Sequence, residues 1–233
     1  MNPGTAALAR GLDVLCALAD PAEPGGLGVV ALAERVGGDK SQVSRTLATL
    51  EERGFVERDR ETLAYRLGWR LFGLAARVGE SRLVADAPPV LRGLVRELGE
   101  SAHLSVRQGA QVLTLVSESP EATIHAPAPI GGLTPLANTS AGRVLAFDLD
   151  DAELESLGLA AQAPAIAAAR SLGYAIVREE FEPGLVAAAA PVRDSTGRVV
   201  AALNVSAPRF RFDTRLEEAA QRVVAAAAAL SQT

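Results

Sequence analysis

Residues 32–68 of the chain read LAERVGGDKSQVSRTLATLEERGFVERDRETLAYRLG. A short helical pattern over 29–36 leads into this stretch and ends at Gly37, a residue that commonly follows a helix C-terminus. Asp39 then stands where it can cap a second helix, and apolar residues recur at helical spacing over 40–53. Two helices joined by so short a turn are typical of a helix-turn-helix.

The flanking segments complete this unit. Two short runs, 55–58 and 63–67, are separated by DRET and predict a small hairpin. Upstream, residues 5–19 place several apolar side chains on one face of an amphipathic helix. These are Leu8, Leu12, Leu15 and Ala19. Three helices followed by a hairpin predict a winged helix-turn-helix domain over residues 1–68.

The helix over 40–53 is predicted to enter the major groove of double-stranded DNA. Its polar residues off the apolar stripe are the candidate DNA contacts: Lys40, Ser41, Gln42, Ser44, Arg45 and Thr49. Gln42 can pair bidentately with adenine and Arg45 with guanine, and the hydroxyls suit a base edge or a phosphate. Lys40, in the first turn, is expected beside a phosphate, where the helix N-terminus also favours an anion. Arg58 and Arg60 on the hairpin are expected to hold the DNA backbone.

The charge balance limits how this chain can bind DNA. Its 233 residues hold 23 Lys and Arg against 28 Asp and Glu, a formal net charge of −5, which argues against non-specific coating of nucleic acid. The segment 40–50 nevertheless contains Lys40, the one lysine of the chain, and Arg45, and no acidic residue. A polar helix face of this kind is also what an ordinary solvated helix presents. Spacing alone therefore leaves both interpretations open.

Other classes of protein find little support in the composition. Cys16 is the single cysteine, so an intrachain disulfide is excluded, and Cys16, His103 and His125 lack the spacing of a zinc site. No metal or other cofactor is therefore expected. Because no run of about 18 apolar residues occurs and the N-terminus lacks the pattern of a signal peptide, we expect a cytoplasmic protein without a membrane partner.

The remainder of the chain changes character. Residues 69–80 predict a linker helix, and helical periodicity resumes over 84–98. Strand-like runs then occur at 103–107, 111–117, 122–126, 174–178, 185–192 and 198–206. Helical stretches occur at 139–147, 151–157, 164–172 and 213–231. Sequential strands joined by tight turns predict an α+β domain over 81–233, an antiparallel sheet with flanking helices.

Three stretches of the sequence resemble those of a known protein family. The stretch 32–68, the segment GGLTPLANTSAGRVLAF over 131–147 and the segment GYAIVREEFEPGLVAAAAPVRDSTGRVVAALNVSAP over 173–208 are similar in order and spacing to the IclR family of bacterial transcriptional regulators. The resemblance covers residues 5 to 231. It implies a repressor or activator that binds an operator as a homodimer or homotetramer, with a GAF-like C-terminal domain for a small metabolite, commonly a carboxylic acid or an aromatic compound.

The resemblance also implies which residues bind that effector. The backbone N–H groups around Ser140, Ala141 and Gly142, at the start of a helix, look like the family's anion-receiving turn, as the helix dipole favours. Polar contacts are implied for Asn204 and Ser206, which lie two apart and so project from one face of a strand. An apolar wall is implied for two further residues, Leu133 and Leu136.

The chain departs from the family at two of these positions. Many relatives carry an acidic residue where this chain has Val177 and a cysteine where it has Ala187. Losing both polar groups implies an effector that is larger, less polar or differently oriented. Glu180 is retained, either as a ligand contact or to bond the loop around Gly184, and His103 and His125 are expected to be structural histidines, with pH sensing as the alternative.

Two other functions remain to be weighed. The chain could be an enzyme with a small-molecule C-terminal domain and an N-terminal docking module, in which Ser140 or Ser206 is a nucleophile. Neither serine lies in a GxSxG motif, and neither histidine has the spacing of a partner base. No catalytic residue is therefore assigned. The third hypothesis keeps the fold but makes it a protein-binding scaffold, which a domain too tightly packed to hold a cavity would favour.

Overall fold

The computed structural model describes residues 3–20, 23, 25–75, 81–121 and 128–231. The chain divides into two compact units, Met1–Ser81 and Arg82–Thr233, which are described separately. Among these residues no helix combines the length and apolar character needed to cross a bilayer.

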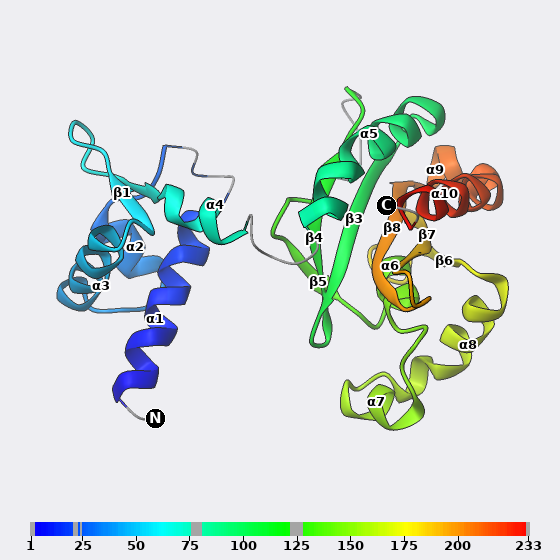
Figure 1. Ribbon diagram of the computed structural model, residues 1–233, viewed down its shortest axis with the longest axis horizontal. Helices are drawn as coiled ribbons and strands as arrows, with labels where there is room; N and C mark the ends of the chain where they lie inside the picture. Colours follow the sequence, from blue (N-terminus) through cyan, green and yellow to red (C-terminus); the bar gives the residue numbers. More distant parts are fainter. Residues whose placement is uncertain (1–2, 21–22, 24, 76–80, 122–127, 232–233) are drawn as a thin grey trace. The chain divides into compact units, whose positions relative to one another are not determined.

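The first unit is a winged helix-turn-helix (Figure 1). Its elements are α1 (Pro3–Leu18), α2 (Val29–Arg35), α3 (Lys40–Glu52), β1 (Val56–Arg58), β2 (Tyr65–Leu67) and α4 (Trp69–Ala75). β1 and β2 pair antiparallel, and Leu27 adds an isolated bridge to Tyr65. All of the first three helices and the hairpin contribute to one core. Its buried residues are Val14, Leu18, Leu27, Leu32, Ala33, Val43, Leu47, Val56 and Tyr65.

The apolar face predicted for the first helix is not the face that α1 buries. Val14 and Leu18 enter the core, whereas Leu8 is 66% exposed and Leu12 is 55% exposed. α1 thus carries two apolar surfaces, of which only one is satisfied within the chain. The exposed one lines a groove between α1 and α3.

The second unit is an α+β domain, as predicted. Its helices are α5 (Ser81–Leu98), α6 (Ser140–Leu145), α7 (Asp151–Ser156), α8 (Ala163–Leu172), α9 (Arg209–Phe212) and α10 (Leu216–Leu230), with 3-10 turns at Ala160–Gln162 and Asp213–Arg215. Its strands are β3 (Ser101–Gln108), β4 (Gln111–Glu118), β5 (Leu133–Pro135), β6 (Ala175–Arg178), β7 (Leu185–Arg193) and β8 (Val199–Pro208). They form one six-stranded sheet in the order β5-β4-β3-β8-β7-β6, in which all neighbours run antiparallel.

Alternation along the strands assigns the two faces of this sheet. In β8, Leu203 and Val205 pack with α5 and α10 in the larger core, whereas Ala202 packs with α6 and α8 on the opposite face. Asn204 shares the face of Ala202 because strand side chains alternate with a period of two. The helices α6 and α8 cover only part of that face, which leaves room for a cavity over β3, β4 and β8.

Some elements differ from the sequence prediction. β5 and α9 were not expected, because three or four residues carry too little periodicity to be recognised. The strand expected at 122–126 lies outside the described residues. The unit boundary falls after Ser81, so α4, the described part of the predicted 69–80 linker, belongs to the first unit by its contacts.

Candidate functional site

The exposed face of α3 is the first candidate site. Val43 and Leu47 are buried, which turns the six predicted DNA contacts of this helix outward. In the part of the chain that the structure describes, Gln42, Ser44 and Arg45 make no side-chain hydrogen bond or ion pair. Their polar groups are therefore available to an external partner.

The other hydroxyl groups on α3 are partly engaged within the chain. Ser41 Oγ donates to Asp39 Oδ1 at 2.5 Å, and Thr49 Oγ1 donates to the carbonyl of Arg45 at 3.1 Å. These hydroxyls keep their lone pairs but have used their protons. Base recognition by donation therefore falls mainly to Gln42, Ser44 and Arg45.

Asp39 occupies the N-terminus of α3, as the sequence predicts for a cap. Its Oδ1 accepts from the backbone N–H groups of Ser41 at 2.8 Å and Gln42 at 3.3 Å. The Ser41 hydroxyl, followed by these N–H groups, holds the pKa of Asp39 below its ordinary value. Two N–H groups that could have received a phosphate are thus already paired, so a phosphate contact at this end depends on the exposed Lys40 side chain.

The hairpin presents its two predicted contacts differently. The guanidinium of Arg58 lies 5.3 Å from the centroid of the Tyr65 ring, a cation–π contact that orients the side chain. Arg60 is exposed on the turn between β1 and β2. Asp59 shapes this turn by accepting from the N–H groups of Glu61 and Thr62, and the Thr62 N–H is the main reason that the pKa of Asp59 is lowered.

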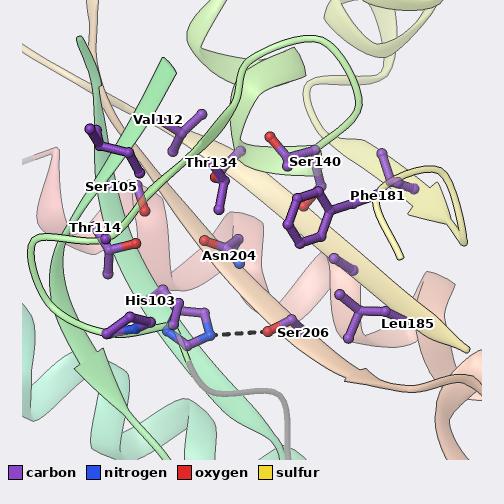
Figure 2. A pocket seen from close by; sticks show the side chains of 18 of the residues that line it. His103, Ser105, Val112, Thr114, Thr134, Ser140, Phe181, Leu185, Asn204 and Ser206 are labelled. Carbon is purple, nitrogen blue, oxygen red and sulfur yellow. Dashed lines mark hydrogen bonds between the residues drawn. The ribbon is translucent and has the colours of Figure 1, made fainter. Parts of the chain in front are cut away.

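The second candidate site is a cavity of about 310 Å³ in the second unit. Its floor is the sheet, and α6, the segment before β5 and the loop between β6 and β7 form the opposite wall (Figure 2). The lining residues are His103, Ser105, Val112, Thr114, Ala128, Pro129, Gly132, Leu133, Thr134, Thr139, Ser140, Ala141, Val177, Phe181, Leu185, Val186, Ala187, Asn204 and Ser206. A cavity of this size fits a small molecule.

Seven of the nine predicted effector contacts line this one cavity. They come from five elements: Leu133, Ser140, Ala141, Val177, Ala187, Asn204 and Ser206. The other two do not line it. Leu136 is 1% exposed and packs into the core beneath α6, and Gly142 packs against the backbone of Leu136, where an added Cβ would lie 2.1 Å from the carbonyl oxygen.

One of the backbone N–H groups at the start of α6 already has a hydrogen-bond acceptor within the chain. Thr139 caps the helix, and its Oγ1 accepts from the Gly142 N–H at 3.1 Å. Gly142 is therefore not a donor for an anion, in contrast to the sequence prediction. Ser140 and Ala141 remain at the cavity wall.

His103 lies on the cavity floor, which the sequence did not indicate. Its ring is held from both sides. Nε2 lies 3.0 Å from Ser206 Oγ (Figure 2), and Nδ1 lies 3.0 Å from Ser117 Oγ. The residue is 2% exposed. These contacts fix the orientation of the imidazole and engage the hydroxyl of Ser206, one of the predicted ligand contacts. The other histidine, His125, lies outside the described residues.

The loop between β6 and β7 is braced by two neighbouring carboxylates. Glu179, not Glu180, accepts from the Gly184 N–H at 2.8 Å, and Glu179 also pairs with Arg209. Glu180 instead accepts from Arg143 of α6. The loop carries Phe181 into the cavity lining, so both pairs position a wall of the cavity.

Several lining residues were missed from the sequence, above all Ser105, Thr114 and Phe181. Strand alternation could have found Ser105, because it is two residues from His103 and shares its face. Thr114 could not be placed in this way, since β3 and β4 change register between Leu104 and Ser105. Phe181 lies in a loop without periodicity.

Two sequence models of protein families match this chain. The IclR helix-turn-helix domain matches residues 7–60, and the model described as bacterial transcriptional regulator IclR C-terminal matches residues 75–232. Together they include both candidate sites.

Individual proteins agree with this match. The HTH-type transcriptional regulator BhcR of Paracoccus denitrificans is 33% identical over 98% of this chain and 87% of its own length. The crystal structure of HmgR from Pseudomonas aeruginosa is 31% identical, with a TM-score of 0.75 over 95% of this chain and 96% of its own. An IclR homologue from Microbacterium hydrocarbonoxydans, crystallised with 4-hydroxybenzoate, is 23% identical and shows the same fold, with a TM-score of 0.83 over 97% of this chain and 98% of its own.

Proposed function

Because this chain belongs to the IclR family of bacterial transcriptional regulators, we propose that it binds a pseudo-palindromic operator in the cytoplasm and that a small metabolite in the cavity modulates its affinity for DNA. The observation that carries this proposal is that one chain combines an exposed polar helix face, on which Gln42, Ser44 and Arg45 are unpaired among the described residues, with a cavity in a separate unit. A regulator needs both.

DNA recognition is assigned to α3 and the hairpin. Arg45 and Gln42 are the base-reading residues, since both are exposed and have free donor groups that suit guanine and adenine. Lys40, Arg58 and Arg60 contact phosphates. Ser41, Ser44 and Thr49 supply further hydroxyl contacts at the same face of the helix.

A homodimer is the proposed DNA-binding form. Exposed apolar residues favour it: Leu8 and Leu12 on α1, and Trp69 and Phe72 on α4, which are 77% and 68% exposed. No described residue of α4 is buried within its own chain. Such surfaces on a helical element are typical of contacts with a second copy, and a symmetric dimer places two recognition helices on two half-sites. Pairing of dimers through the second unit would give a tetramer.

The cavity is the proposed effector site. The family resemblance points to a carboxylic acid or an aromatic compound, and the solved homologue that holds 4-hydroxybenzoate is an example of such a ligand in this fold. Binding changes DNA affinity only if the effector binds more tightly to one arrangement of the dimer than to the other. The linker over 69–80 is the proposed route between the two units.

Selection of duplexes from a random DNA library with the full chain tests the proposal. We expect an enriched inverted repeat, with two half-sites about one helical turn or a multiple of it apart. The Arg45→Ala chain, carried through the same selection, should lose the enrichment at one base pair of each half-site. Failure of the native chain to enrich any sequence would contradict DNA recognition.

The enzyme alternative is not favoured. The curated relatives carry the names of transcriptional regulators and repressors. Ser206, one of the two serines considered as a nucleophile, does contact a histidine, since His103 Nε2 lies 3.0 Å from its Oγ. The other ring nitrogen faces Ser117 rather than a carboxylate, so the arrangement differs from a Ser-His-Asp triad. The scaffold alternative is weakened by the cavity itself.

A further inference from the structure

The floor of the cavity is divided into a polar half and an apolar half. On the three strands β4, β3 and β8 most of the side chains that face the cavity are polar, among them Thr114, Ser105 and Asn204, and Val112 of β4 is the apolar exception. On the adjacent strands β7 and β6 they are Ala187 and Val177. Ser105 pairs directly with Thr114 across the β3–β4 ladder, so their hydroxyls are neighbours on one face.

The polar half holds buried groups without partners inside the protein. Asn204 is 8% exposed, Ser105 2% and Thr114 4%. Across the described ranges none of these three side chains makes a hydrogen bond, and Figure 2 shows all three at the cavity. Because their polar atoms open into the cavity, these three side chains are the groups with which a bound ligand can pair.

Among the described lining residues His103 is the one ionisable side chain, and its two ring nitrogens already face Ser117 and Ser206. No Lys, Arg, Asp or Glu is among these lining residues. Arg143, three residues from Ser140 on α6, is turned away to Glu180 and to the carbonyl of Ile176. A carboxylate bound among these residues would therefore give up its hydration without a Lys or Arg counter-charge, which is unfavourable in a buried site.

We propose that the effector is an electrically neutral ring compound whose hydroxyl or carboxamide group is bound by Asn204, Ser105 and Thr114, and whose ring lies over Val177 and Ala187. This inference rests on the proposed effector site and narrows its ligand class. Asn204 has a donor and an acceptor on one planar group, so it complements a carboxamide or a hydroxyl on both counts, whereas a carboxylate offers acceptors only.

Matched ligand sets test the inference by isothermal titration of the full chain. One set is 4-hydroxybenzoate, 4-hydroxybenzamide and 4-hydroxybenzyl alcohol; the other is cyclohexanecarboxylate, cyclohexanecarboxamide and cyclohexylmethanol. At about pH 7.5 only the first member of each set is charged. We expect a neutral member of at least one set to bind about tenfold or more tightly than its carboxylate, because the carboxylate is desolvated without a counter-charge.

Variants assign the preference to the polar half of the floor. Thr114→Val and Asn204→Leu each remove hydrogen-bonding groups with little change in volume, and each should weaken the neutral ligand about tenfold. Gln108→Leu, at an exposed position on β3, is the matched control and should leave affinity unchanged. Thermal midpoints confirm folding, and Thr114→Val is decisive alone if Asn204→Leu fails to fold.

Each outcome bears on one of the two proposals. If both carboxylates bind as tightly as the neutral members of their sets, or more tightly, the inference of a neutral effector is wrong, whereas the proposal of an effector site in this cavity stands. Binding of neither set, or neutral binding unaffected by Thr114→Val, also overturns this inference. A neutral ligand that binds as expected but does not change affinity for the selected DNA supports this inference and contradicts the proposed regulation.

Discussion

Arg143 Nη2 lies 2.7 Å from Glu180 Oε2, so an ion pair joins α6 to the loop between β6 and β7, two elements that both line the cavity. The two partners are unequally buried, since the Arg143 side chain is 10% exposed and that of Glu180 is 43% exposed. Arg143 also donates to the carbonyl of Ile176 at 3.1 Å. The arginine is thus the structural member of the pair.

Substitutions of the two partners should therefore differ in cost. Arg143→Leu removes both the hydrogen bond to the Ile176 carbonyl and the ion pair with Glu180, and it should destabilise the second unit by about 1–3 kcal/mol. Glu180→Gln keeps a hydrogen-bonding group in a partly solvated position and should cost less than about 1 kcal/mol. Scanning calorimetry of the full chain measures both. Equal costs would contradict the assignment of the structural role to Arg143.

Gly142 offers a test of the role that the structure gives it. A Cβ at this position would lie 2.1 Å from the Leu136 carbonyl oxygen, so Gly142→Ala forces α6 away from the segment beneath it and should cost about 1–3 kcal/mol. At Gly93, inside α5, a Cβ would meet nothing within 4 Å. Gly93→Ala should be neutral or stabilising by up to about 1 kcal/mol. Thermal unfolding of both variants checks the contrast; a neutral Gly142→Ala would refute the close approach.

Local signals explain why the first unit was predictable. The Asp39 cap and the Val43 and Leu47 stripe act within one helix, and the structure has both where the sequence places them. The α1 prediction failed in one respect, because Leu8 and Leu12 have helical spacing but face away from the core. Periodicity identifies an apolar face and does not say whether its partner is in the same chain.

The cavity was only partly predictable for a related reason. Asn204 and Ser206 share a face because strand alternation is a local rule. Thr114 is placed by a register shift between β3 and β4, and the burial of Leu136 depends on how α6 packs over the sheet. Both are set by contacts between segments distant in sequence, which residue patterns do not specify.

The Asp39 cap should make the stability of the first unit depend on pH. Because the pKa of Asp39 is lowered in the folded state, its contribution is complete above the unfolded-state value of about 3.9 and is lost as pH falls through the folded-state pKa. Asp39→Asn keeps a capping oxygen but removes the charge. The difference in thermal midpoint between the native chain and this variant should therefore shrink as pH falls from about 5 to 2. A constant difference would contradict the charge effect.

Arg45 should carry sequence specificity. If its exposed guanidinium pairs with a guanine, Arg45→Ala should cost about 1–3 kcal/mol of operator binding and relax the preference at that base pair. Fluorescence anisotropy with the selected operator and its single-base variants measures this. Unchanged affinity and preference would remove Arg45 from the set of base contacts.

Lys40→Ala is the matched comparison for Arg45→Ala, since both remove one positive charge from α3. A phosphate contact carries no sequence information, so the loss of affinity should be the same for all duplexes. The slope of log K against the logarithm of salt concentration should become shallower by about one unit. A loss confined to one base pair would instead assign Lys40 to base recognition.

The exposed apolar face of α1 should be required for operator binding by a dimer. Leu12 is 55% exposed and lines the groove between α1 and α3, so Leu12→Glu should leave the fold of the unit intact. A charge on this face would disfavour its burial against a second copy, and loss of the dimer removes one of the two half-site contacts. We expect a smaller mass in analytical ultracentrifugation and at least about tenfold weaker operator binding. Glu34→Gln, at an exposed position of α2, provides a surface control. Operator affinity equal to that of the native chain would show that this face plays no part in the assembly that binds DNA.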